Sequence, residues 1–236
     1  MSLSLEYSSY QFNGNDELCL RAGAVHSKTI LIIPPLFDEM NRMRRMLVDV
    51  MRLLDERAIG SILPDLPGTN ESVFPQDQTS LAIWRNALNA CSKTLAEPYK
   101  IASFRGGCLV DDFTDNVAKW RLSPVKGLTL LRTMMRTRIA SDKEAGMATT
   151  MAQLTTEAAE SQVNLAGNTI GTALFSDLEN ALPPSSSAVR TAQLENDTKA
   201  ADIRLSGSAL WLRAEPGDDL LLSGAIATDL TSWMSA

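Results

Sequence analysis

Short apolar runs alternate with longer amphipathic segments along most of the chain. The run Lys28–Ile33 is almost entirely apolar and β-branched, which is typical of a strand buried on both of its faces. Beyond it, Met40, Met43 and Leu47 recur at helical spacing, which predicts a helix from about Glu39 to Arg57. Strands that alternate with helices in this way predict a mostly parallel sheet with helices on both faces.

The same patterns give the remaining elements of the expected fold. Further strands are predicted at Ser61–Leu63, Lys100–Ser103, Trp120–Leu122, Val189–Leu194 and Ala209–Leu212. Further helices are predicted at Ser80–Leu95, from the turn after Ser103 to about Val117, through most of Leu128–Ala181 and at Leu220–Met234. Residues 1–27 predict one or two antiparallel strands at a sheet edge, whereas Lys28–Ile33 and Lys100–Ser103 are expected as adjacent inner parallel strands.

Length and charge bound the possible functions. The sequence has 236 residues, enough for a single domain over 1–236 with a sizeable core. The stretch Pro183–Ser187 is therefore expected to be a loop, since too little chain follows it to form a second core. A net charge of -6 without a basic stripe argues against nucleic acid as a partner. No apolar run is long enough to span a bilayer, and the N-terminal residues lack the pattern of a signal peptide.

The cysteine and histidine content narrows the chemistry further. Cys19, Cys91 and Cys108 are odd in number and widely spaced, which favours reduced, buried thiols in a cytoplasmic protein. The sequence has no C-x-x-C pair, and His26 is its only histidine. We therefore expect neither a metal site nor a cofactor.

The other elements are organised around the stretch Tyr99–Val110. Its apolar run ends in small residues, Gly106 and Gly107 follow, and a second apolar run begins at Cys108. This order predicts a buried strand, a sharp turn and the start of a helix. Ligands of parallel sheets bind beyond the carboxyl ends of the strands. The loops expected at those ends are Pro34–Met40, Asp65–Ser72, Ser103–Cys108, Ser123–Gly127, Glu195–Asp197 and Ala214–Asp219.

Four segments in or beside these loops carry recognisable motifs. They read P-P-L-F-D-E-M-N-R-M-R-R-M at Pro34–Met46, D-L-P-G-T-N-E-S at Asp65–Ser72, W-R-L-S-P-V-K-G at Trp120–Gly127 and V-N-L-A-G-N at Val163–Asn168. Through them the chain from Lys28 onward resembles the α/β-hydrolases. It looks most like the exosortase A system-associated hydrolases, found near bacterial exopolysaccharide and protein-sorting loci. The resemblance implies an α/β-hydrolase-type fold with a small helical cap over about 128–181. Arg132 and Arg136 would share one face of that cap, exposed or meeting acidic loop residues.

The resemblance also places a nucleophile elbow, G-x-S-x-G in α/β-hydrolases, at Ser103–Gly107. Here Ser103 stands in the place of the first glycine, and Arg105 stands in the place of the nucleophilic serine. A guanidinium stays protonated and cannot attack a carbonyl carbon. The frame of a hydrolase is therefore present with its reactive atom replaced.

The sequence does not supply the other two residues of a catalytic triad in full either. An ester hydrolase of this kind needs a nucleophile, an acid and a histidine in that chain order. Glu195 or Asp197 would supply the acid. The loop expected to carry the histidine contains Glu215 and Asp218 but no histidine, and His26 precedes the central strand. A serine therefore lacks its usual general base near neutral pH.

These residues favour a non-standard or catalytically silent hydrolase-like protein that binds a small anionic or acylated molecule. Arg105 would hold an anion at a helix N-terminus, in a site formed with Phe104, Gly106, Leu36 and Phe37. The alternative for Arg105 is an internal salt bridge to one of the acidic residues in the surrounding loops, which are Asp38, Glu39, Glu215 and Asp218.

Two further classes of function stay open. The protein can be an active carboxylester or thioester hydrolase, or an acyltransferase, that uses Ser103 or Cys108 as a displaced nucleophile. It can also be a structural partner in an exopolysaccharide or protein-sorting system, without a pocket ligand. A homodimer is compatible with each of these functions.

Overall fold

The computed structural model describes residues 5–185 and 188–235 of the chain. Its main sheet has the strand order β1-β2-β4-β3-β5-β6-β9-β10. These strands are β1 (Leu5–Phe12), β2 (Asn15–Ala22), β3 (Thr29–Ile33), β4 (Gly60–Pro64), β5 (Tyr99–Phe104), β6 (Lys119–Leu122), β9 (Val189–Leu194) and β10 (Ile203–Leu205). The α-helices are α1 (Asp38–Asp55), α2 (Leu81–Ser92), α3 (Gly127–Glu144), α4 (Met151–Glu160), α5 (Thr172–Asn180) and α6 (Leu220–Ser235).

The expected sheet topology is confirmed. From β4 to β10 all neighbouring strands run parallel, and the β1–β2 hairpin adds two antiparallel strands at one edge. β3 and β5 are adjacent inner strands, with Thr29 opposite Tyr99 and Ile33 opposite Ser103. Parallel pairing brings the carboxyl ends of both strands to the same edge of the sheet, where Arg105 and the loop after Ile33 meet.

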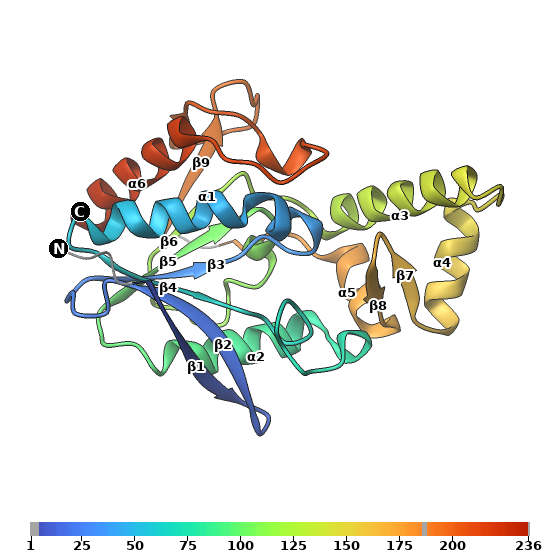
Figure 1. Ribbon diagram of the computed structural model, residues 1–236, viewed down its shortest axis with the longest axis horizontal. Helices are drawn as coiled ribbons and strands as arrows, with labels where there is room; N and C mark the ends of the chain where they lie inside the picture. The colour runs from blue at the N-terminus through green and yellow to red at the C-terminus, as the bar shows by residue number, and fades with distance from the viewer. Residues whose placement is uncertain (1–4, 186–187, 236) are drawn as a thin grey trace.

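Alternation along β3 buries both faces of the sheet. Ile30 and Ile32 pack in the core under α1 and α6, whereas Leu31 and Ile33 pack in the core on the α2 side. In Figure 1 α1 and α6 lie side by side over one face, with α2 on the other. All four side chains have an exposed fraction of 0%. Each contributes about 1.5–3 kcal/mol through burial, which explains why a five-residue strand anchors the sheet.

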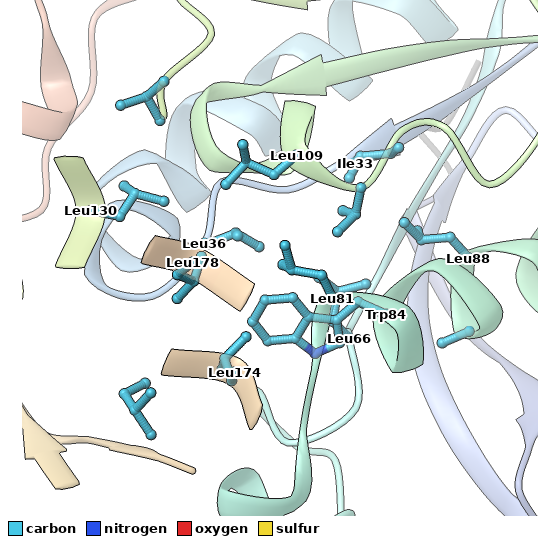
Figure 2. Close-up of a cluster of buried hydrophobic side chains, with 14 of the residues drawn as sticks. Ile33, Leu36, Leu66, Leu81, Trp84, Leu88, Leu109, Leu130, Leu174 and Leu178 are labelled. Carbon is cyan, nitrogen blue, oxygen red and sulfur yellow. The ribbon is translucent and has the colours of Figure 1, made fainter. Parts of the chain in front are cut away.

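Trp84 of α2 lies at the centre of the core on that second face. Figure 2 shows it among leucines from several elements, including Leu174 and Leu178 of α5. Its indole Nε1 donates to the Pro67 carbonyl at 2.9 Å, so the polar atom of this buried ring is satisfied. The same cluster therefore ties α2 to the loop after β4 and to α5.

The segment from Gly127 to Ala181 lies between β6 and β9, two strands that pair directly. Figure 1 shows it projecting beyond one end of the main sheet. The prediction of an all-helical segment was wrong in one part, because β7 (Val163–Leu165) and β8 (Asn168–Ile170) form a hairpin. Its turn residues, Ala166 and Gly167, have φ of 52° and 82°, the two positive values that a tight hairpin requires.

Two of the arginines of α3 lie as expected. Arg132 and Arg136 are exposed on one face of the helix. Arg138 instead donates to both carboxylate oxygens of Asp142 at 2.8 Å and to the Asn164 carbonyl at 2.8 Å. It therefore joins α3 to the β7–β8 hairpin.

Two predicted elements are absent from the structure. The helix expected from the turn to Val117 is only a short 3-10 helix, η2 (Arg105–Leu109), because turn-forming aspartates follow and Asp111 is held by Arg121. The strand predicted at Ala209–Leu212 is also wrong, since Leu210–Leu212 is a 3-10 helix, η3. The last strand is β10, which has only three residues and a central arginine.

The three cysteines are free and buried, as predicted. None of the helices within 5–185 and 188–235 is both long enough and apolar enough to cross a membrane. The predicted loop Pro183–Ser187 is described only as far as Ser185, since Ser186 and Ser187 lie outside the described residues. Residues 1–4 of the predicted N-terminal edge also lie outside them.

The buried carboxylate of Glu17 on β2 lowers the stability of the fold when it is charged. The residue is 1% exposed, and neither carboxylate oxygen has a well-formed hydrogen bond within the residues that the structure describes. Burial raises the pKa of Glu17, the Ser72 hydroxyl opposes this rise, and the Asp65 carboxylate adds to it. A raised folded-state pKa means that the group's contribution to stability is complete below the unfolded pKa, about 4.3, and is lost as the pH rises through the folded pKa.

We therefore expect Glu17→Gln to stabilise the protein at pH 8 by on the order of 1 kcal/mol and to have little effect at pH 4. Urea unfolding at the two pH values measures the difference in free energy of unfolding. Glu6→Gln, at an exposed position on the neighbouring strand, is the matched control and should change stability at neither pH. A destabilised Glu17→Gln protein at pH 8 would show that the carboxylate has partners that the static structure lacks.

Candidate functional site

The turn after β5 has the backbone expected of an elbow. Arg105 has a φ of 53°, in the left-handed region that residues other than glycine seldom adopt. The two glycines that follow are required by close packing. A Cβ on Gly107 would lie 2.4 Å from the Pro34 carbonyl oxygen, and one on Gly106 would lie 2.8 Å from Leu130 Cδ1. The turn is therefore fixed against both the loop after β3 and helix α3.

The Arg105 guanidinium at the apex of this turn is already paired. Its Nη2 and Nε donate to the Glu39 carboxylate at 2.8 and 3.2 Å, and Nη1 donates to the Ser123 carbonyl at 3.1 Å. The Trp211 ring centroid lies 4.4 Å from Cζ, a cation–π distance. The salt-bridge alternative is thus the one observed, with Glu39 as the partner. No long helix starts at Arg105, so the helix dipole that was expected to attract an anion at this position is missing.

The two candidate displaced nucleophiles are buried. Ser103 and Cys108 both have an exposed fraction of 0%. The Cys108 thiol lies 3.5 Å from the Ser103 carbonyl oxygen, to which it donates. Burial raises the pKa of Cys108 well above its usual value, and the nearby Asp111 carboxylate adds to the rise. The thiol is therefore protonated at neutral pH, whereas a cysteine nucleophile reacts as the thiolate.

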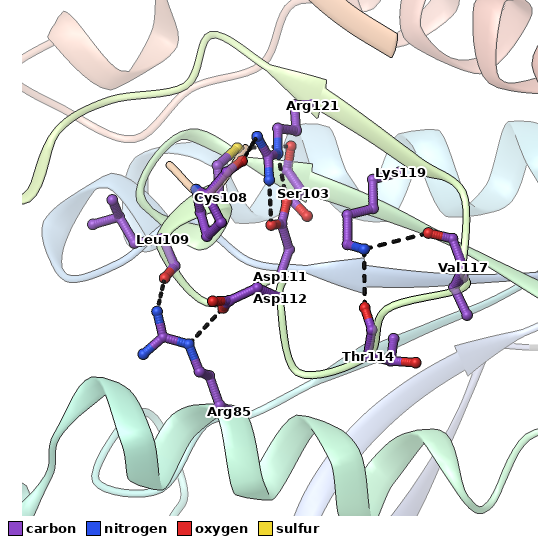
Figure 3. Close-up of polar contacts among 11 residues, drawn as sticks. Arg85, Ser103, Cys108, Leu109, Asp111, Asp112, Thr114, Val117, Lys119 and Arg121 are labelled. Carbon is purple, nitrogen blue, oxygen red and sulfur yellow. Dashed lines mark hydrogen bonds and ion pairs between the residues drawn. The ribbon is translucent and has the colours of Figure 1, made fainter. Parts of the chain in front are cut away.

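A buried ion pair lies directly behind the turn. Figure 3 shows Asp111 and Arg121 beside Ser103 and Cys108. Arg121 donates from Nη2 and Nε to the two carboxylate oxygens of Asp111 at 2.6 and 2.7 Å, and from Nη1 to the Pro184 carbonyl at 2.8 Å. Asp111 has an exposed fraction of 0%; burial raises its pKa and Arg121 opposes that rise. Sequence reasoning missed this pair.

The predicted acid residues are placed elsewhere. Glu195 is exposed and accepts a hydrogen bond from the Ser206 hydroxyl at 2.5 Å. Asp197 accepts one from its neighbour Lys199 N at 2.9 Å. Both therefore serve the local turn between β9 and β10 rather than the Arg105 site.

The final loop also does not reach Arg105 in the way expected. Asp218 pairs with Arg45 at 2.7 Å, and Glu215 is exposed. The histidine of the sequence, His26, contacts Asp55 at 2.8 Å. Asp55 is the last residue of α1 and His26 precedes β3, so this pair lies at the amino-terminal end of the strands. It is therefore at the opposite end of the strands from the elbow.

Two cavities open at the carboxyl ends of the strands. The smaller, of about 110 Å³, is lined by Arg105, Glu39 and Trp211 together with side chains from the start of α3. The larger, of about 360 Å³, is bordered by the loops after β3 and β4 and by the β7–β8 hairpin. Leu36 and Phe37 line both cavities and form the wall between them.

The remaining predicted residues have a different role. Phe104 packs inside the core against Trp120, with ring centroids 5.7 Å apart, and Gly106 is buried beneath Leu130. Within 5–185 and 188–235, no group of three or more His, Cys, Asp or Glu residues is arranged to hold a metal ion. Sequence reasoning named the loop Asp65–Ser72 and the motif ending at Asn168 but did not predict that they would share a cavity.

Comparison with known proteins identifies the architecture. No known family profile matches the chain, and no curated protein sequence matches it significantly. Mouse alpha/beta hydrolase domain-containing protein 10 is similar in structure, with 16% identity, a TM-score of 0.51 and coverage of 82% of this chain and 77% of that one. Est1E from Butyrivibrio proteoclasticus, solved with bound ferulic acid, has 13% identity, a TM-score of 0.53 and coverage of 79% and 77%. At such identities the likeness shows the shared architecture alone.

Proposed function

We propose that this chain, which has the α/β-hydrolase fold, is a catalytically silent member of that fold that acts by binding a small molecule at the carboxyl ends of its strands. The observation that carries the proposal is the state of Arg105. It occupies the apex of the elbow with a φ of 53°, and Glu39 binds it through both carboxylate oxygens. A side chain held in this way stabilises the turn and offers no nucleophile.

The burial of the alternative nucleophiles favours this proposal over an active hydrolase. Acyl transfer needs a nucleophile within hydrogen-bond reach of a base and open to the substrate carbonyl. Ser103 and Cys108 are both fully buried, and the titratable neighbour they share, Asp111, is engaged by Arg121. His26 lies with Asp55 at the other end of the strands.

The link to exosortase A system-associated hydrolases belongs to this proposal as well. It rests on the resemblance of Pro34–Met46, a segment that contributes Glu39 to the Arg105 pair and Leu36 and Phe37 to both cavities. Three of the resembled segments therefore contribute to one region, since Thr69 and Asn70 of the second motif and Asn168 of the fourth also border the larger cavity. A ligand-binding role is the function that this clustering favours.

We expect the purified protein to hydrolyse p-nitrophenyl acetate, p-nitrophenyl butyrate and an acyl thioester no faster than heat-inactivated protein. Arg105→Ser should remain inactive, because a serine at the apex would still lack a histidine base. Labelling with a fluorophosphonate probe provides the second measurement and should be absent in both proteins. Turnover by the wild type that Ser103→Ala or Cys108→Ala abolishes would instead establish a displaced nucleophile.

A further inference from the structure

We propose that the 360 Å³ cavity binds a small, uncharged molecule bearing several hydroxyl groups, the chemical class of a monosaccharide. This inference rests on the proposed binding function and names its ligand class. The volume lies near the lower end of small-molecule sites, roughly 300–1,000 Å³. The cavity is also placed where parallel sheets bind ligands, beyond the carboxyl ends of β3 and β4.

The lining of the cavity is polar but uncharged. Among the residues that the structure places around it, none is Asp, Glu, Lys or Arg. The polar side chains that line it are Asn41, Thr69, Asn70, Gln76 and Asn168. Carboxamides both donate and accept hydrogen bonds, which matches the dual character of a hydroxyl group. A charged ligand would lose hydration here without gaining a counter-ion, so a neutral ligand is favoured.

Several of these carboxamides are held in place by hydrogen bonds to other groups of the protein. Asn70 donates from Nδ2 to Asp65 at 2.6 Å, which leaves its carbonyl oxygen for a ligand. Gln76 accepts from the Thr169 backbone N–H at 2.7 Å and donates to Asn168 Oδ1 at 3.4 Å. Side chains that are positioned before binding lose little conformational entropy when a ligand arrives, which favours affinity and specificity.

The apolar wall of the cavity has an unusual backbone. Phe37 has a φ of 57°, a value that bulky residues avoid and that costs of order 1–3 kcal/mol. Its ring contacts Trp84, with centroids 5.9 Å apart, and it lines the cavity with Leu36, Met40 and Leu66. Aromatic and aliphatic side chains in one cavity with a set of carboxamides suit a ring that has C–H groups on one face and hydroxyl groups at its edge.

The cavity is separate from the charged elbow. The Arg105–Glu39 pair lines the 110 Å³ cavity on the other side of the Leu36–Phe37 wall. A negatively charged sugar therefore has no partner in the larger cavity. This separation lets an experiment distinguish the two sites by the charge of the probe.

Saturation-transfer difference NMR with the full chain tests the assignment. The neutral probes are D-glucose, D-galactose and N-acetyl-D-glucosamine, and the charged probes are D-glucuronic acid and D-glucosamine. We expect saturable binding of at least one neutral sugar and weaker binding of both charged sugars. Asn41→Ala, at an exposed position on α1, should weaken that binding about fivefold to tenfold through the loss of one hydrogen bond. Asn168→Ala should weaken it as well, because Asn168 accepts a hydrogen bond from Gln76 and holds that carboxamide in place.

Asn86→Ala, at an exposed position on α2, is the matched control and should leave the affinity unchanged. Thermal unfolding of each variant verifies that it is folded. The assignment is overturned if no neutral sugar binds saturably, if only glucuronic acid binds, or if the cavity variants bind like the control. If no sugar binds and the protein shows no esterase turnover, the sugar assignment fails but the silent-hydrolase proposal is unaffected. Esterase turnover would refute the silent-hydrolase proposal, independently of the sugar-binding results.

Discussion

Arg121→Ala should lower the free energy of unfolding by roughly 3–5 kcal/mol, the range observed when one partner of a buried ion pair is removed. Asp111, with an exposed fraction of 0%, would keep its carboxylate in the core without the two hydrogen bonds that Arg121 donates. The Pro184 carbonyl would lose its donor at the same time.

Urea unfolding followed by circular dichroism measures this loss. Arg52→Ala is the control, because Arg52 pairs with Asp49 on the surface and should contribute at most about 0.5 kcal/mol. The double variant Asp111→Leu with Arg121→Met should recover part of the loss, since it removes both charges together. A loss for Arg121→Ala no larger than that of Arg52→Ala would show that the pair contributes nothing to stability.

Glu39→Ala should lower the free energy of unfolding by about 2–3 kcal/mol. Arg105 is 8% exposed and would lose two charge-assisted hydrogen bonds while remaining enclosed by Trp211 and Ser123. The effect is smaller than for Arg121 because Glu39 retains some access to water, with 13% of its side chain exposed.

Asp218→Ala is the discriminating comparison for Glu39→Ala. The sequence alone makes Asp218 an equal candidate for the partner of Arg105, yet the structure pairs it with the exposed Arg45. Its removal should therefore change the urea midpoint little, whereas removal of Glu39 should lower it clearly. Equal losses in the two variants would mean that Arg105 exchanges between the acidic partners in solution.

The elements best predicted from sequence are those whose pattern follows directly from burial. Thr29–Ile33 has apolar side chains on both faces, and this alone indicates an inner strand. Val189–Leu194 was predicted with its observed bounds, although only its last three residues are buried. β10 was missed because three residues with a central arginine carry too little periodicity to distinguish a strand from a loop.

The candidate site was predicted in position but only partly in its contacts. The elbow turn is local, so the two glycines and the apolar runs around them indicate it. The partner of Arg105 depends on where α1 begins, since Glu39 accepts from Arg105 whereas the adjacent Asp38 accepts from Asn168. The larger cavity depends on the packing of the β7–β8 hairpin against Gln76, a contact between segments far apart in the chain. Patterns within one segment do not encode such contacts.

The insertion of Gly127–Ala181 between β6 and β9 has a consequence for the protein as it leaves the ribosome. Domains fold as their chain emerges, and β6 has no neighbour on one side until Val189–Leu194 has been synthesised. During that interval β6 is a temporary edge strand, the kind of surface that pairs with other nascent chains. Lys119 and Arg121 place two positive charges in this four-residue strand and discourage such pairing.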